Sequence, residues 1–423
     1  MKIRITSVLT LLLAATLFLF SCNGGNKGKS NENEKGTSTE KGAGADSSTK
    51  SGSAKDTNTV SKGTNAGTEA PVMKERMFND VARLLAGLPQ EKGSKLDSLE
   101  KTPTWKSHAA NFNRTWASIT KKRLGPMANW ASKELKDINA DGDEMFYPFS
   151  GPDFMNMFTF FPEAKTYRML ALEPAGFLPN VDKFNEEELN IYLNSVQKDL
   201  KDIFILSFFI TKNMHKDLVH GTVNGALPLI SIFIVRTGNT ILNIERIRID
   251  KDGKIVAMPN DSTVKAINAG VRITFKPKDK EETRTVYYFS ADISDVGLDK
   301  NPGLNKYLSD LGPQNSYLKS ASYLLHYDHF SKFRNLLLDK SDHLLQDDAG
   351  VAYRFFKKDI WDIQLYGKWV KPIPLFHKME QLDLKEAYQK DSSNVRPIPF
   401  SIGYNFSSKD SPILILANKK KKK

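Results

Sequence analysis

The sequence predicts an α+β fold in which a helical N-terminal part packs with a mainly antiparallel, β-rich C-terminal part. Apolar residues recur at helical spacing through about the first 70 residues of the folded region, which begins near Val72. From Ile241 onward apolar residues alternate with a period of two, which is typical of half-buried strands. Residues 73–418 are long enough for a large core and form either one globular unit or two tightly packed units that divide near residue 237.

Helices account for most of the first part. Helical spacing predicts helices at residues 77–88, around 116–119, at 127–138, at 185–211 and at 226–235. The fourth of these begins with Asn185 and Glu188 at the spacing of a capping box, in which each side chain satisfies a backbone N–H of the other residue. Between the third and fourth helices, residues 167–172 favour a buried strand within a block rich in proline and aromatic residues.

Strands and turns dominate the second part. The turn sequence Asp250-Lys251-Asp252-Gly253 separates residues 241–249 from residues 254–258 and predicts a hairpin. Residues 271–275 are expected to pair with residues 285–289 across a charged turn. The remaining expectations are a helix at residues 317–338 and strands at residues 351–356, 361–369, 399–406 and 412–416.

The first 21 residues have the pattern of an export signal. Lys2 and Arg4 precede an apolar run at residues 8–20. Those residues would span roughly 20 Å as a helix, short of the roughly 30 Å hydrocarbon core of a bilayer. The run therefore predicts a cleavable leader and not a permanent membrane span.

The lone cysteine of the chain, Cys22, follows this run directly. The segment Leu19-Phe20-Ser21-Cys22 resembles the lipobox of bacterial lipoproteins, although Phe20 stands where that motif usually has a small residue. The resemblance implies that the Cys22 thiol receives a diacylglyceryl group, that the leader is cut before it, and that the new amino group is acylated. Two or three acyl chains hold a protein on a bilayer firmly. The alternative is an ordinary secretory signal with an incidental cysteine.

Residues 22–72 predict a flexible tether. They are rich in Gly, Ser, Thr and Lys and contain no aromatic residue, so they cannot bury enough apolar surface to offset the entropy of ordering. A coil of about 50 residues reaches roughly 35 to 42 Å, which would hold a folded domain clear of a membrane. Asn23 is not the Asp that retains enterobacterial lipoproteins in the inner membrane, which favours the outer membrane of the cell envelope.

Charge is concentrated at the ends of the chain. Of the net charge of +12, the leader contributes +2, residues 23–72 contribute +1 and the lysine tail at residues 419–423 contributes +5, which leaves +4 for residues 73–418. That value is ordinary for a folded surface and gives no reason to expect a nucleic-acid partner. The tail is expected to be a solvated end, with attraction to anionic lipid or polysaccharide as the alternative.

One candidate ligand cleft lies around the segment "FYPFSGPDF", residues 146–154. This block resembles one found in uncharacterised exported bacterial proteins, a resemblance that implies no activity. The polar side chains of this region are Ser150, Asp153, Arg168 and Glu173, which are candidates to line a cleft. The alternative is a packed turn in which Asp153 or Ser150 caps backbone donors. Ser150 does not lie in the G-x-S-x-G motif of an exposed nucleophile.

His326 and His329 are the candidate metal ligands. On the helix predicted for this region they would share a face, and a carboxylate from elsewhere would complete the site. The alternative is a pair of half-buried histidines held by hydrogen bonds. No phosphate loop, dinucleotide fingerprint or H-E-x-x-H motif occurs, so no cofactor is predicted.

These patterns predict a membrane-anchored lipoprotein of the cell envelope, held by lipid on Cys22, that binds a partner or supports envelope assembly. The expected partners are membrane lipid and an envelope protein or polysaccharide. The alternative is a hydrolase of an envelope polymer that uses paired carboxylates such as Asp153 and Glu173. No catalytic set can be named from the sequence.

Overall fold

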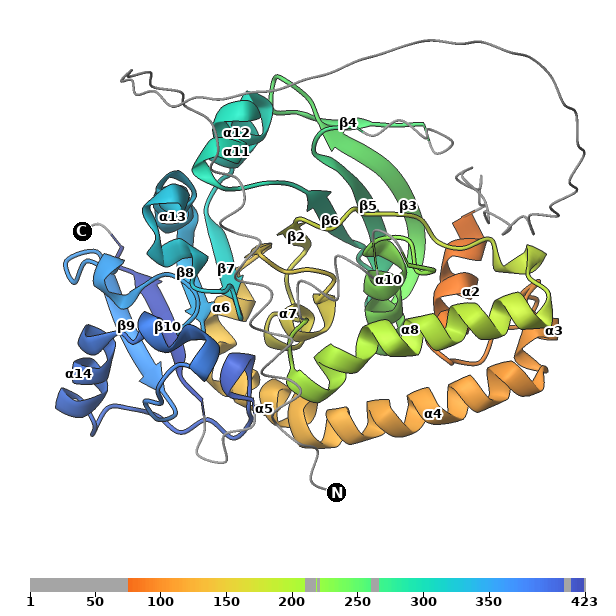
Figure 1. Cartoon of the computed structure of the whole chain (residues 1–423), viewed down its shortest axis with the longest axis horizontal. Coiled ribbons are helices and arrows are strands. Elements are labelled where there is room, and N and C mark those ends of the chain that lie inside the picture. Colours follow the sequence, from red (N-terminus) through yellow and green to blue (C-terminus); the bar gives the residue numbers. More distant parts are fainter. Residues whose placement is uncertain (1–74, 210–217, 219–220, 260–265, 407–411, 422–423) are drawn as a thin grey trace, which may run out of the picture.

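The computed structural model describes residues 75–209, 218, 221–259, 266–406 and 412–421, and these residues contain one ten-stranded mixed sheet (Figure 1). The strands are β1 (Glu144–Pro148), β2 (Thr166–Ala171), β3 (Thr240–Ile249), β4 (Ile255–Ala257), β5 (Ala269–Lys276), β6 (Arg284–Ser290), β7 (Gln314–Leu318), β8 (Ser341–Gln346), β9 (Trp361–Tyr366) and β10 (Leu414–Lys419). Their order across the sheet is β4-β3-β5-β6-β2-β1-β7-β8-β10-β9. The five central strands, from β6 to β8, are parallel, and the pairings on either side of them are antiparallel.

Helices cover both faces of this sheet. The longer ones are α2 (Glu75–Leu85), α4 (Pro103–Ile119), α5 (Gly125–Glu134), α7 (Phe154–Phe160), α8 (Glu186–Leu206), α10 (Leu227–Arg236), α12 (Pro302–Ser309), α13 (Ser331–Lys340) and α14 (Leu382–Lys390). The shorter ones are α3 (Asp97–Glu100), α6 (Lys136–Asp141) and α11 (Asp295–Lys300). In Figure 1, α4 and α8 lie side by side, and α11, α12 and α13 lie across the sheet from them.

Two hydrophobic cores lie on the two faces of the central strands. Met145 and Tyr147 of β1 point into the core shared with α2, α4, α5, α7, α8 and α10, whereas Phe146 between them points into the core shared with α11, α12 and α13. Because both faces are covered, consecutive residues of β1 and β7 are buried, as is usual in the central strands of parallel sheets. Both cores combine residues from before and after residue 237.

The predicted α+β fold is confirmed. The residues before β1 are helical, and within the C-terminal part five of the six strand pairings are antiparallel. The hairpin of β3 with β4 and the pairing of β5 with β6 lie where the alternating pattern predicts them. The capping box is present, since Asn185 Oδ1 accepts from Glu188 N at 2.9 Å and Glu188 Oε2 accepts from Asn185 N at 2.9 Å.

The expectation of a helix at residues 317–338 is wrong for its first half. Residues 314–318 form β7, two short 3₁₀ turns follow, and only α13 is a regular helix. Tyr317 and Leu318 point into opposite cores, and a strand buried on both faces has no period that separates it from a helix. The expected strands at residues 351–356 and 399–406 are also wrong, because 3₁₀ turns lie there at Tyr353–Phe355 and Gly403–Asn405. β1 and β8 were not predicted.

The lysine tail begins later than the sequence suggested. Lys419 is the last residue of β10, and its Nζ donates to the backbone oxygen of Asp339 at 2.5 Å. Lys420 Nζ donates to the backbone oxygen of Lys358 at 2.7 Å. The leader, Cys22, the tether and the end of the predicted helix at residue 211 lie outside the described residues. Among the helices of the described part, none combines the length and apolarity needed to span a bilayer.

Candidate functional site

The carboxyl ends of the central parallel strands define the region where a ligand site is expected. From β1 the chain passes through α7 to β2 on one side, and it later returns to place β7 on the other side of β1. In an open sheet of parallel strands with helices on both faces, ligands bind outside the carboxyl ends of the strands where the strand order reverses in this way. Here that position lies beyond the ends of β1 and β7.

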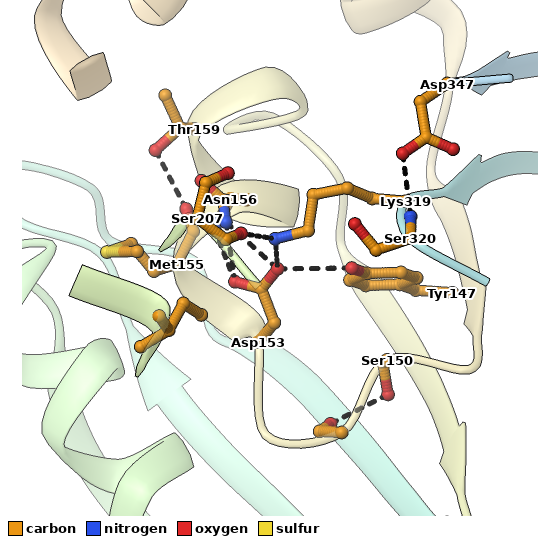
Figure 2. Close-up of polar contacts among 12 residues, drawn as sticks. Tyr147, Ser150, Asp153, Met155, Asn156, Thr159, Ser207, Lys319, Ser320 and Asp347 are labelled. Carbon is orange, nitrogen blue, oxygen red and sulfur yellow. Dashed lines mark hydrogen bonds and ion pairs between the residues drawn. The ribbon is translucent and has the colours of Figure 1, made fainter. Parts of the chain in front are cut away.

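A buried ion pair occupies this position. Asp153 lies in the loop after β1 and caps the N-terminus of α7, and Lys319 follows the last residue of β7. The ammonium of Lys319 forms an ion pair with Asp153 and donates to the backbone oxygen of Ser207 at 2.5 Å (Figure 2). Asp153 is 1% exposed and Lys319 is 4% exposed. Burial lowers the pKa of Lys319, and the charge of Asp153 opposes that shift.

The carboxylate of Asp153 is surrounded by further donors. Tyr147 OH donates to Oδ2 at 3.1 Å, and the amide nitrogen of the Asn156 side chain lies 3.0 Å from both Asp153 oxygens. The backbone N–H of Asn156 donates to Oδ1 at 3.2 Å and completes the helix cap. Burial, followed by the charge of Asp153, raises the pKa of Tyr147 well above its usual value. The sequence-based alternative of a capping role for Asp153 is therefore confirmed, but the same carboxylate also pairs with a buried lysine.

A π-helical turn brings a second cation to the cluster. Residues Thr120–Leu124 form a π-helix between α4 and α5, and such turns occur often at functional sites. Arg123 on this turn donates from Nη2 to the backbone oxygen of Ile203 at 3.1 Å. Burial lowers the pKa of Arg123, and among charged groups Asp153 opposes this most strongly.

Several buried polar atoms of this cluster have no hydrogen-bond partner among the described residues. They are Arg123 Nε, Asn156 Oδ1, Ser207 Oγ and Tyr317 OH. Asn156, Ser207 and Tyr317 are each at most 1% exposed. Leaving a buried polar group unpaired costs about 1–3 kcal/mol, so unpaired groups are rare in folded proteins and each calls for an explanation. Their grouping around one ion pair is the arrangement expected where a polar ligand is bound.

Two further buried acids follow β8. Asp347 accepts from the backbone N–H of Ser320 at 2.8 Å and from that of Ala349 at 3.0 Å, and Asp348 accepts from Tyr323 OH at 2.6 Å. Burial, followed by the neighbouring charge of Asp348, raises the pKa of Asp347 to about 7. Burial raises the pKa of Asp348 to about 6. At neutral pH this pair therefore holds fewer than two negative charges.

Backbone strain is concentrated in the same loops. Seven non-glycine residues of the described part have positive φ, and five of them lie in the loops around the cluster: Phe149, Ser207, Ser320, Ser322 and Tyr323. Their φ values lie between 52° and 70°, a region that side chains with a Cβ rarely adopt. Residues held in such conformations gather at binding and catalytic sites.

The candidate cleft is only partly assembled as the sequence suggested. Ser150 is buried after β1, where its hydroxyl donates to the backbone oxygen of Gly151 at 2.8 Å. Glu173 follows β2 at the same edge of the sheet, and burial raises its pKa to about 7. Arg168 lies on the other face, where it forms an ion pair with Glu144 and donates to Tyr307 OH at 3.1 Å. Arg168 is separated from Asp153 because neighbours along a strand point to opposite faces.

The structure does not place the two candidate metal ligands on one helical face. His326 ends the 3₁₀ turn Leu324–His326 and is buried, whereas His329 lies in the turn Asp328–Phe330 and is exposed. Tyr327 between them has extended backbone angles of −94° and 156°. Burial lowers the pKa of His326 to about 4. In the described ranges no three His, Cys, Asp or Glu side chains gather closely enough to hold a metal ion.

Sequence reasoning missed Lys319, Arg123 and Asp347. Lys319 and Asp347 each stand directly after a buried strand, a position that would have marked them if β7 and β8 had been recognised. Arg123 lies between two helices and carries no local signal.

Comparisons with known proteins add no name to this site. No family model matches the chain, and no similar curated protein or solved structure is found. Its function is therefore inferred from its own residues.

Proposed function

We propose that this protein is a bacterial lipoprotein, anchored in the cell envelope by acyl chains on Cys22, whose folded part binds a small polar ligand beside Asp153 and Lys319. The anchoring half of the proposal rests on the lipobox resemblance of Leu19 to Cys22 and on the tether that follows it. The binding half rests on the buried polar cluster at the carboxyl edge of the parallel strands. An outer-membrane location is part of the proposal because Asn23 follows the cysteine.

One observation carries the binding half. The Asp153–Lys319 pair lies at the strand-order reversal, and four buried polar atoms around it have no partner among the described residues. If the ion pair had only a structural role, the polar atoms around it would be expected to form hydrogen bonds within the protein. A buried polar cluster with unpaired atoms is less stable than apolar packing of the same volume. A bound ligand that supplies the missing partners accounts for the arrangement.

Labelling of the native host with a fatty-acid probe tests the anchor. The wild-type protein is expected to carry the label and to sediment with membranes, whereas Cys22→Ala is expected to lose both. Retention of Cys22→Ala in the membrane fraction without label would contradict lipid anchoring at this residue. Fractionation of inner and outer membranes in the same experiment tests the location.

Mass spectrometry of small molecules released from the purified protein tests ligand binding. Protein isolated from its native membrane is denatured in organic solvent, and the released compounds are compared between the wild type and Tyr317→Phe. We expect a compound that is released from the wild type and is depleted in the variant, because the variant removes one unpaired hydroxyl and keeps the ring. Equal release from both proteins, or none from either, would count against this function.

A hydrolase remains the second candidate because two buried acids can carry a proton near neutral pH. Burial raises the pKa of both Glu173 and Asp347 to about 7, which suits a general acid. The pairing of Asp153 with Glu173 is not favoured, since Asp153 is engaged by Lys319. Release of soluble fragments from purified envelope polymers by the wild type but not by Glu173→Gln or Asp347→Asn would support this function.

A further inference from the structure

Arg123 is a buried cation that forms no ion pair with a carboxylate of the described residues. Asp153 is the carboxylate whose charge acts most strongly on Arg123, but Asp153 is already paired with Lys319. The charge of Asp347 also acts on Lys319, and because burial raises the pKa of Asp347 to about 7, this residue holds only part of a negative charge at neutral pH. Because a buried charge without a close partner is destabilising, this arrangement favours an anionic group beside Arg123.

We propose that the cluster binds a small carboxylate that carries a hydroxyl or amino group, with Arg123 and Tyr317 holding the carboxylate and Asn156 accepting from the second group. The inference rests on the proposed ligand-binding function and names the class of ligand. It follows from the unpaired atoms, because Arg123 Nε is a donor, Tyr317 OH can donate, and Asn156 Oδ1 can only accept. A ligand that offers acceptors to the first two atoms and a donor to the third satisfies these three, and the fourth unpaired atom, Ser207 Oγ, can pair with either kind of group because a hydroxyl both donates and accepts.

Asn156 selects for ligands that carry a hydroxyl or amino group besides the carboxylate. Its side-chain nitrogen is committed to both oxygens of Asp153 at 3.0 Å, which fixes the orientation of the amide and leaves Oδ1 as an acceptor. A carboxylate without a hydroxyl or amino group would leave this buried oxygen unpaired. A site with a buried polar group discriminates against ligands that cannot pair with it.

Asp153 selects against a phosphate. Its carboxylate caps α7 and occupies the position at the loop after β1 where parallel-sheet proteins bind a phosphate group. A second charge on the ligand would lie near this carboxylate and would be repelled by it. A singly charged carboxylate balances Arg123 without that repulsion.

Four compounds with a three-carbon skeleton test the ligand class. Lactate and alanine carry both groups, propionate carries the carboxylate alone, and propane-1,2-diol carries hydroxyls without charge. Each is titrated into the mature protein in detergent while the unfolding temperature, Tm, is recorded at neutral pH. We expect lactate or alanine to raise Tm at lower concentrations than propionate, and propane-1,2-diol to leave Tm unchanged. Inorganic phosphate is the fifth probe, with no stabilisation expected.

Tyr317→Phe and Tyr288→Phe separate ligand binding from general effects on packing. Tyr317→Phe is expected to raise the dissociation constant for lactate or alanine about tenfold or more, which corresponds to loss of one hydrogen bond to a charged group. Without ligand it should be at least as stable as the wild type, since the lost hydroxyl has no partner among the described residues. Tyr288 lies buried on the same face, and its hydroxyl donates to the backbone oxygen of Glu173 at 2.9 Å, so Tyr288→Phe should bind normally.

The outcomes distinguish the ligand class from the proposed function. Stabilisation by phosphate or by propane-1,2-diol alone, abolished in Tyr317→Phe, would overturn the ligand class and leave ligand binding at this cluster supported. No response of the wild type to lactate or alanine, or a response that Tyr317→Phe leaves intact, would overturn the inference. If the protein from native membranes also releases no compound, the proposed function fails with it.

Discussion

Lys319 and Asp153 form a buried ion pair between residues that lie 166 positions apart in the sequence. Lys319 directly follows β7, and Asp153 lies in the loop after β1 as the N-cap of α7, so the pair connects two adjacent parallel strands at their carboxyl ends (Figure 2). Both side chains are almost fully enclosed, and each depends on the other for its charge balance. The stability of the fold and the chemistry of the candidate site therefore depend on the same contact.

Lys319→Met is expected to destabilise the protein by about 3–5 kcal/mol, because it removes the ion-pair partner of the buried Asp153 carboxylate. Urea unfolding at neutral pH measures the loss. Lys332→Met is the matched control, since Lys332 forms an exposed ion pair with Asp299 that should contribute at most about 1 kcal/mol. The double variant Lys319→Met with Asp153→Asn should lose less than the sum of the single losses. Additive losses would show that the two side chains do not interact.

Asp347→Asn is expected to change how stability depends on pH. The folded protein holds a proton on Asp347 up to a pKa of about 7, whereas the unfolded chain releases it near pH 4. This group therefore contributes stability below about pH 4 that is lost as pH rises towards 7. Asn does not titrate, so the variant should lose less stability than the wild type between pH 5 and pH 8. Parallel stability curves for the two proteins over that range would contradict the assignment.

His108 should change the pH dependence of stability in the opposite direction to Asp347. Its Nε2 lies 2.8 Å from the backbone oxygen of Leu85 and its Nδ1 lies 2.8 Å from Gln197, so it connects α4 to α2 and α8. Burial lowers its pKa to about 4, and the stability it contributes is present above pH 6.5 and is lost as pH falls to 4. Over this range the loss is at most about 3 kcal/mol. His108→Gln should be less stable at pH 7 but should lose less between pH 7 and pH 5, as measured by urea unfolding.

Asn185→Ala removes the cap of α8 and should cost about 1 kcal/mol. Two backbone N–H groups, those of Asn185 and Glu188, depend on this capping box. Asn190→Ala is the matched control, because Asn190 is exposed within the same helix, where Ala is the better helix former. A chemical-denaturation comparison in which both variants lose the same stability would argue that the box contributes nothing beyond helix propensity.

Local elements could be predicted because their causes lie within a few residues. The β3–β4 turn is held by Asp250, whose Oδ1 accepts from Asp252 N at 3.0 Å and from Lys254 N at 2.8 Å. The capping box of α8 is equally local. Alternation predicted β3 and β5 because each has a more exposed face. β7, buried at every position, carries no such signal, and its last two residues fall within the helix predicted at residues 317–338.

The sequence by itself determined the α+β class, the helical first part, the antiparallel hairpins and the capping box of α8, because these features depend on hydrogen bonds and apolar periods within a few residues. It offered a capping role for Asp153 or Ser150 as an alternative, and the structure assigns that role to Asp153. Only the tertiary structure decided that Asp153 meets Lys319, that Arg123 joins them and that Arg168 lies on the opposite face. Those relationships depend on the strand order β2-β1-β7-β8, which brings distant segments together at one edge of the sheet. Strand order follows from the packing of the whole core, and no short stretch of sequence encodes it.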